Sequence, residues 1–145
     1  MKNVIISITG AQNLSQIKQP EDVIELITEG EYKFEGDGGE LSYMESELTG
    51  MEGTKTSLIF SPTEIVLSRE GTLTSRMVFK EGIKNTFLYD TPYGSATMGL
   101  DTRKIRTNFG PRGGDMEIDY VIDFDNLQVG RNKFRVTVRE QGGAH

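Results

Sequence analysis

DMEIDYVIDFDNLQVGRNKFRVTVRE, residues 115–140, alternates hydrophobic and charged residues through both of its halves. The first half alternates Met116, Ile118, Tyr120, Ile122 and Phe124 with Glu117, Asp119, Val121 and Asp123. The second half alternates Phe134, Val136 and Val138 with Lys133, Arg135, Thr137 and Arg139. A period of two is typical of β-strands, and Asn126 and Gly130 between the halves suit a turn. The segment therefore predicts a hairpin with one apolar and one charged face.

The charged face of this hairpin predicts how its two strands align. If Asp123 faces Lys133, acids of the first strand lie opposite or diagonal to bases of the second. The acidic positions, which also suggest a calcium site or an acid pair, are Asp115, Glu117, Asp119, Asp123 and Asp125. Strand spacing places them on the outer face, so we interpret them as groups that serve solubility and register.

Short alternating segments separated by turn residues make up the rest of the chain. Strands are expected over residues 2–10, 22–36, 40–49, 54–60, 65–70, 73–79, 96–100 and 105–109, and around Phe87 and Tyr89. Turns are expected at 37–39, 101–104 and 110–114, and Gly30 marks a bulge or a bend within its strand. With the last hairpin, the pattern predicts an all-β fold of about ten strands. Consecutive hairpins favour a single antiparallel, mostly up-and-down β-barrel over a Greek key.

Length and charge limit the kind of protein and its partners. A chain of 145 residues is typical of one domain, which we place at residues 1–140, with 141–145 as a flexible C-terminal tail. The net charge of -6 repels phosphate backbones and anionic lipids, so neither nucleic acid nor a membrane is an expected partner. No segment reaches the ~20 apolar residues that span a bilayer, and no signal-peptide core is evident. We therefore expect a cytoplasmic protein.

The rarest residue types exclude several chemistries. The chain has no cysteine, so it lacks disulfides, thiolate nucleophiles and sulfur ligands for zinc. Its one histidine, His145, is the last residue, so a catalytic triad or an imidazole metal site is not expected. Two runs are rich in glycine, residues 36–39 and 110–114, and neither fits a phosphate-binding motif. We predict no catalytic residues, no metal and no cofactor.

Several short blocks, spread from the second expected strand to the penultimate one, resemble the YwiB-like family of bacterial β-barrel proteins, a family of unknown function. The matching blocks are residues 28–30, 43–50, 53–56, 69–71, 77–79 and 89–94, together with Tyr120. The resemblance implies a closed or nearly closed barrel similar to those of the lipocalins, or calycins, and the fatty-acid-binding proteins. It implies no activity, because the family has none to transfer.

Arg69 is the most informative polar residue of the chain. It continues the face of Ile65 and Leu67, so alternation directs it into the barrel. A buried cation needs a charged or strongly polar partner. We favour an internal ion pair with Glu45 or Glu47, and the alternative is the head group of an anionic ligand.

Tyrosines supply the remaining candidate ligand contacts. Tyr43, Tyr89, Tyr93 and Tyr120 carry phenol groups that suit the mouth of a cavity. Filling of the barrel ends by these rings is the competing interpretation, because aromatic side chains dominate protein cores.

Three functional hypotheses follow from these residues. The leading one is non-enzymatic binding of a small, partly apolar ligand, with an anionic head group as one option, in or at the mouth of the barrel, by Arg69, the tyrosines and the two glutamates. The alternative is a filled barrel that acts through its outer surface, as an interaction or structural module, and the sequence leaves a homodimer open. The third is an enzyme with Glu45 or Glu47 as acid and base.

Overall fold

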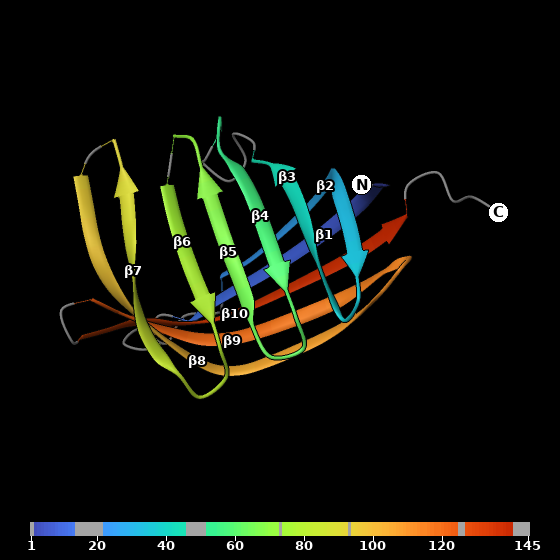
Figure 1. Ribbon diagram of the computed structural model, residues 1–145. Coiled ribbons are helices and arrows are strands. Elements are labelled where there is room, and N and C mark those ends of the chain that lie inside the picture. Colours follow the sequence, from blue (N-terminus) through green and yellow to red (C-terminus); the bar gives the residue numbers. More distant parts are fainter. Residues whose placement is uncertain are drawn as a thin grey trace.

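The computed structural model describes residues 2–13, 22–45, 52–72, 74–92, 94–124 and 127–140, and these form ten antiparallel strands with no helix among them. The strands are β1 (Lys2–Asn13), β2 (Asp22–Glu35), β3 (Gly38–Met44), β4 (Lys55–Phe60), β5 (Ile65–Glu70), β6 (Thr74–Phe79), β7 (Lys84–Thr91), β8 (Gly94–Gly110), β9 (Gly113–Phe124) and β10 (Leu127–Glu140). Each strand pairs with the next one along the chain, and β1 pairs with β10. The predicted up-and-down barrel is confirmed (Figure 1).

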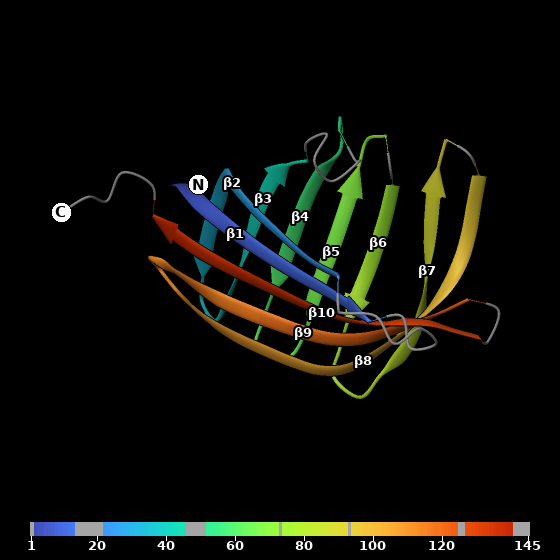
Figure 2. The same ribbon diagram turned by 180° about the vertical axis from the view of Figure 1, so that it is seen from behind.

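Two long strands turn the corners of the barrel. Strand β2 pairs first with β1, over Asp22–Tyr32, and then with β3, over Glu31–Glu35. Strand β8 pairs first with β7, over Gly94–Asp101, and then with β9, over Gly99–Gly110. Figures 1 and 2 show the result: the long strands β8, β9, β10 and β1 cross one side of the molecule, and the shorter strands β3 to β7 form the other wall.

Local backbone features explain both corners. Gly30 lies where β2 leaves β1 for β3, and a Cβ atom there would lie only 2.4 Å from the carbonyl oxygen of Ser42. Its pairing with β1 shows no register shift, so Gly30 marks the predicted bend and not a bulge. At the other corner, the turn expected at 101–104 is wrong. Strand β8 continues through a register shift between Thr102 and Lys104, because a bulge bends a strand without ending it.

The β9–β10 hairpin keeps the predicted faces but not the predicted register. The prediction placed Lys133 opposite Asp123. In the structure Lys133 lies opposite Asp119, and Arg135 lies opposite Glu117. The reason is a short connection followed by a bulge between Gln128 and Gly130. Three of the five carboxylates form ion pairs on the outer face, as their strand spacing predicted: Arg106–Asp115 at 2.7 Å, Arg131–Asp119 at 2.9 Å, Arg135–Asp115 at 3.8 Å and Lys133–Glu117 at 4.0 Å.

Apolar side chains fill the barrel toward the β2–β3 and β8–β9 turns. The rings of Phe60 and Phe109 stack with centroids 4.2 Å apart, and Tyr32 adjoins both. The Tyr32 hydroxyl donates a hydrogen bond of 2.6 Å to the carbonyl oxygen of Gly110. Burial raises the pKa of Tyr32 to about 12. The core continues through buried aliphatic residues, among them Leu41, Leu58, Leu67, Met77 and Ile118.

Candidate functional site

A row of polar residues crosses the inner face of the short-strand wall. Tyr43 of β3 lies opposite Thr56 of β4, Thr56 lies opposite Arg69 of β5, and Arg69 lies opposite Ser75 of β6. We call these four residues the polar row. Each strand alternates these positions with its outward residues, and Tyr43, Thr56 and Ser75 are buried. Polar groups thus occupy one level of the β3–β6 wall, and the next inward level consists of Leu41, Leu58, Leu67 and Met77.

Glu45 completes the polar row at its β3 end. Its carboxylate is buried, and the Thr56 hydroxyl donates a hydrogen bond of 2.5 Å to its Oε2 atom. The backbone N–H of Glu45 donates to the carbonyl oxygen of Thr54 at 2.8 Å, which holds it beside β4. Burial and the nearby Glu45 carboxylate raise the pKa of Tyr43, and the Arg69 cation opposes that shift. Tyr43 therefore remains a neutral phenol.

The guanidinium of Arg69 lies within electrostatic range of two walls. It opposes the rise in the pKa of Tyr43 on β3 and in that of Tyr120 on β9. Burial has the larger effect, so both pKa values are raised. The ring of Tyr120 packs against Phe79, with centroids 4.9 Å apart. The predicted inward direction of Arg69 agrees with these relations.

Arg69 is incompletely paired among the described residues. Its Nε atom is buried and has no hydrogen-bond partner there. The ion pairs found in that part of the chain do not include Arg69, so the favoured pair with Glu45 is not formed within 4.0 Å. Glu45 instead accepts its hydrogen bond from Thr56, which is closer to it along the strand register. Glu47 lies outside the described residues.

Ser75, next to Arg69, also has a buried polar atom without a hydrogen bond. Its Oγ atom is buried and likewise has no hydrogen-bond partner in the described chain. Strands β6 and β7 pair only at Thr74–Asp90 and Ser75–Tyr89, so their seam is short. A pocket of about 500 Å³ opens over this region, lined by Ile59, Val66, Ser68, Arg69, Glu70, Thr74, Ser75, Arg76 and Leu88. We call it the seam pocket.

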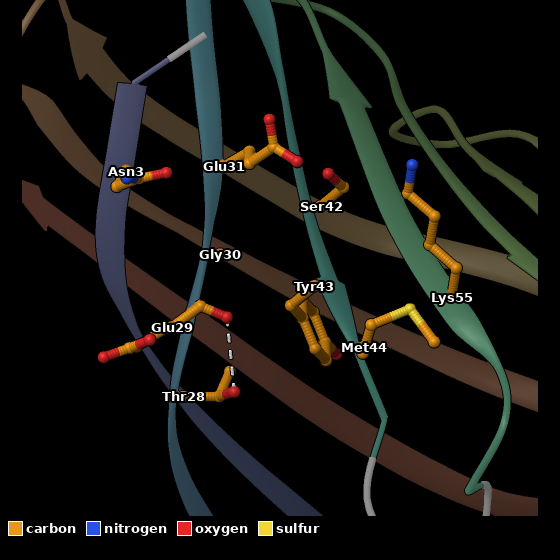
Figure 3. A pocket seen from close by; sticks show the side chains of 9 residues that line it. All are labelled: Asn3, Thr28, Glu29, Gly30, Glu31, Ser42, Tyr43, Met44 and Lys55. Carbon is orange, nitrogen blue, oxygen red and sulfur yellow. Dashed lines mark hydrogen bonds between the residues drawn. The ribbon is translucent and has the colours of Figure 1, made fainter.

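A second depression of about 520 Å³ lies where β2 leaves β3 (Figure 3). Its lining residues are Asn3, Thr28, Glu29, Gly30, Glu31, Ser42, Tyr43, Met44 and Lys55. Figure 3 shows Tyr43 on β3 between Gly30 and Met44, with Lys55 beyond them on β4. Both hollows are lined mainly by the outward residues of their strands, and the polar row lies behind them on the inner face of the wall.

The structure brings part of the predicted site together. Tyr43, Glu45 and Arg69 lie in or beside the polar row, and Tyr120 approaches it from β9. The backbone of Tyr89 lies opposite Ser75, but its side chain is outside the described part, as is all of Tyr93. Sequence reasoning missed Thr56 and Ser75 as site residues. The available signal was their placement on the inward faces of strands next to that of Arg69.

Two further features are absent from the described part of the chain. It contains no group of three or more His, Cys, Asp or Glu side chains arranged to hold a metal ion. No helix in that part is long and apolar enough to cross a membrane.

The fold and the polar row define a ten-stranded, up-and-down antiparallel β-barrel with a buried polar level. The model of the family described as "Domain of unknown function (DUF1934)" matches residues 6–136, and the chain belongs to this family. The crystal structure of the ywiB protein from Bacillus subtilis is similar, with a TM-score of 0.83 and 18% identity over 97% of this chain and 92% of that one. This confirms the resemblance to the YwiB-like barrels. No functionally curated protein matches the sequence.

Proposed function

We propose that the barrel binds a small, partly apolar molecule at the polar row, on the inner face of the β3–β6 wall. The observation that supports this function is the pair of buried atoms, Arg69 Nε and Ser75 Oγ, that lack hydrogen-bond partners and belong to cross-strand neighbours of that row. Buried polar groups are almost always satisfied in folded proteins, because leaving one unpaired costs about 1–3 kcal/mol. A ligand with acceptor atoms would satisfy both groups.

The seam pocket lies on the other side of the same wall. Ile59, Val66 and Arg76 alternate with the inward residues of their strands, so this pocket of about 500 Å³ opens on the outer face. Its apolar residues are partly exposed, with 46% of Ile59 and 53% of Leu88 accessible. It is therefore separate from the unpaired atoms of the polar row.

A protein-interaction surface is the second candidate function. The exposure of Ile59 and Leu88 on one wall also favours a partner protein or a second copy of the chain. This function does not explain why Arg69 Nε and Ser75 Oγ lack hydrogen-bond partners, and for that reason ligand binding is the better proposal.

Native mass spectrometry of gently purified protein tests the two functions together. Ligand binding predicts a monomer with a reproducible small-molecule adduct, released on denaturation. The adduct should be lost from Arg69→Gln and retained by Arg76→Gln, because Arg76 lies on the outer face of the same wall and is exposed. A bare dimer in place of a loaded monomer would favour the interaction surface and contradict ligand binding.

A further inference from the structure

The strands that close the barrel carry an ordered pattern of charge on their outer face. Strand β1 pairs with β10 on one side and with β2 on the other, in continuous register (Figure 2). Val4, Ile6 and Ile8 of β1 are buried in the core, so the alternate residues of β1 and their cross-strand partners face outward. These outward residues form three rows from β10 through β1 to β2, which together we call the closing face: Arg139, Ile5 and Glu29; Thr137, Ser7 and Ile27; and Arg135, Thr9 and Glu25.

The closing face has a positive edge, an uncharged middle and a negative edge. Arginines on β10 and glutamates on β2 end its first and third rows, and all four of these side chains are exposed. Arg139 is not part of any ion pair found among the described residues, and its partner on β9 is Gly113, which brings no charge. The guanidinium of Arg139 can therefore pair with an acid of another molecule.

This charge pattern complements itself under one two-fold rotation. A second copy turned by 180° about an axis parallel to β1 places β10 of each copy opposite β2 of the other and keeps each row at its own height. Arg139 then lies opposite Glu29 of the second copy, and the same contact forms twice. Rotation about the perpendicular axis in the sheet would place Arg139 against Arg135, and like charges disfavour that pairing. The charges thus select a single arrangement.

The middle row supplies an apolar contact for the same arrangement. Ile27 is 70% exposed, the largest fraction among the exposed large hydrophobic side chains of the described residues. In the two-fold pair it lies opposite Thr137 of the second copy, and the small side chain of Ser7 between them lets the two sheets approach. Burial of Ile27 in both copies removes apolar surface from water, which favours association.

We infer that two copies of the chain associate weakly through the closing face, with the two-fold axis along β1. Three strands on the outside of a barrel offer a small contact area, and interfaces below about 1,200 Å² are typical of transient complexes. The dissociation constant should therefore be on the order of 0.1 mM. At the micromolar concentrations of native mass spectrometry the protein is then a monomer, so this inference is independent of ligand binding.

Sedimentation equilibrium over protein concentrations from about 10 µM to about 1 mM tests the association. The wild-type protein should form dimers in about 0.1 M salt. In about 1 M salt the dissociation constant should rise at least about tenfold, because the Debye length falls from about 10 Å to about 3 Å. The absence of dimers at the highest concentration in the weaker salt would overturn the inference. An association that salt leaves unchanged or strengthens would also overturn it, because it would not depend on these charges.

Reversed charges test the two-fold arrangement itself. Arg139→Glu and Glu29→Arg should each weaken association at least about tenfold, since each places like charges together at two equivalent contacts. An equimolar mixture of these two variants should associate within about threefold of the wild-type protein. In a mixed pair the two substituted side chains face each other and the two native ones do the same. Recovery in the mixture also shows that both variants are folded. A mixture that stays dissociated would overturn the arrangement.

Matched substitutions on the β3–β6 wall and on β7 provide the controls. Arg76→Glu reverses an exposed charge on β6 and should leave association within about twofold of the wild-type value. Ile27→Ser should weaken association by about tenfold. Leu88→Ser removes a side chain that is 53% exposed on β7, and it should have no effect. A loss confined to Leu88→Ser would place the interface on the other wall and overturn the inference.

Discussion

Arg69 of β5 lies directly opposite Ser75 of β6, and neither the buried Nε of the first nor the buried Oγ of the second has a hydrogen-bond partner in the described chain. Adjacent strands thus present two unsatisfied donors side by side on the inner face of the wall. Stability alone does not explain this arrangement, since apolar residues at both positions would remove the desolvation cost. The pair therefore has opposite consequences for stability and for binding.

Ser75→Ala should separate these two consequences. The substitution removes a buried, unpaired hydroxyl, so the free energy of unfolding of the ligand-free protein should stay the same or rise by up to about 1 kcal/mol. Retention of the co-purifying molecule should weaken in the same variant. Urea denaturation measures the first quantity and native mass spectrometry the second. A clear loss of stability would show that Ser75 makes a structural hydrogen bond, and would contradict the unsatisfied state.

Thr56→Val should behave in the opposite way. Thr56 is fully buried and donates a hydrogen bond of 2.5 Å to the Glu45 carboxylate. Valine has a similar shape but no donor, so the free energy of unfolding should fall by about 1.5–3 kcal/mol. A double-mutant cycle with Glu45→Gln, followed by urea denaturation, measures the coupling between the two side chains. Additive losses would mean that this hydrogen bond contributes nothing to stability.

The inner and outer faces of the strands were predictable from alternation alone. Thr54, Thr56 and Ser75 were placed on inward faces by their neighbours, and all three are buried. In the C-terminal hairpin, Phe124 was expected inside but is 48% exposed. It lies at the end of β9, where the bulge in β10 changes the pairing.

The register of the strands was not predictable, and the candidate site depends on it. A bulge adds one residue to one strand, and nothing in the polar run 101–104 distinguishes a bulge in a continuing strand from a turn. The same limit applies to Arg69. Alternation directs it inward, but only the alignment of three hairpins shows that its neighbours are Thr56 and Ser75 and that Glu45 pairs elsewhere.

Gly30→Ala tests the corner of β2. The added Cβ would lie 2.4 Å from both the Ser42 carbonyl oxygen and the Cδ1 atom of Ile6. Because the first of these is backbone, the two strands must move apart, and the free energy of unfolding should fall by about 1–3 kcal/mol or more. Gly10→Ala is the matched control, since nothing lies within 4 Å of its added Cβ. Its effect should stay within about 0.5 kcal/mol. Equal effects of the two substitutions in urea denaturation would contradict the close approach at Gly30.

The buried tyrosines predict how stability responds to alkaline pH. The pKa values of Tyr32, Tyr43 and Tyr120 are all raised, and burial is the largest cause for each. Above the unfolded pKa of about 10, the unfolded chain loses phenol protons that the folded chain keeps. Stability from these groups is therefore complete below pH 10 and declines as the pH rises through the folded pKa values, which for Tyr32 means to about 12.

Tyrosinate absorbance, followed against pH in the folded protein and in urea, measures this difference. Of the five tyrosines, at least three should titrate late in the folded protein, and all should titrate near pH 10 in urea. Tyr32→Phe should remove one late phenol, and it should make the decline of the urea midpoint above pH 10 less steep. The same variant loses the hydrogen bond to Gly110, so its midpoint at pH 7 should be lower than that of the wild-type protein. If every phenol of the folded protein titrated near pH 10, the burial of these rings in the barrel would be contradicted.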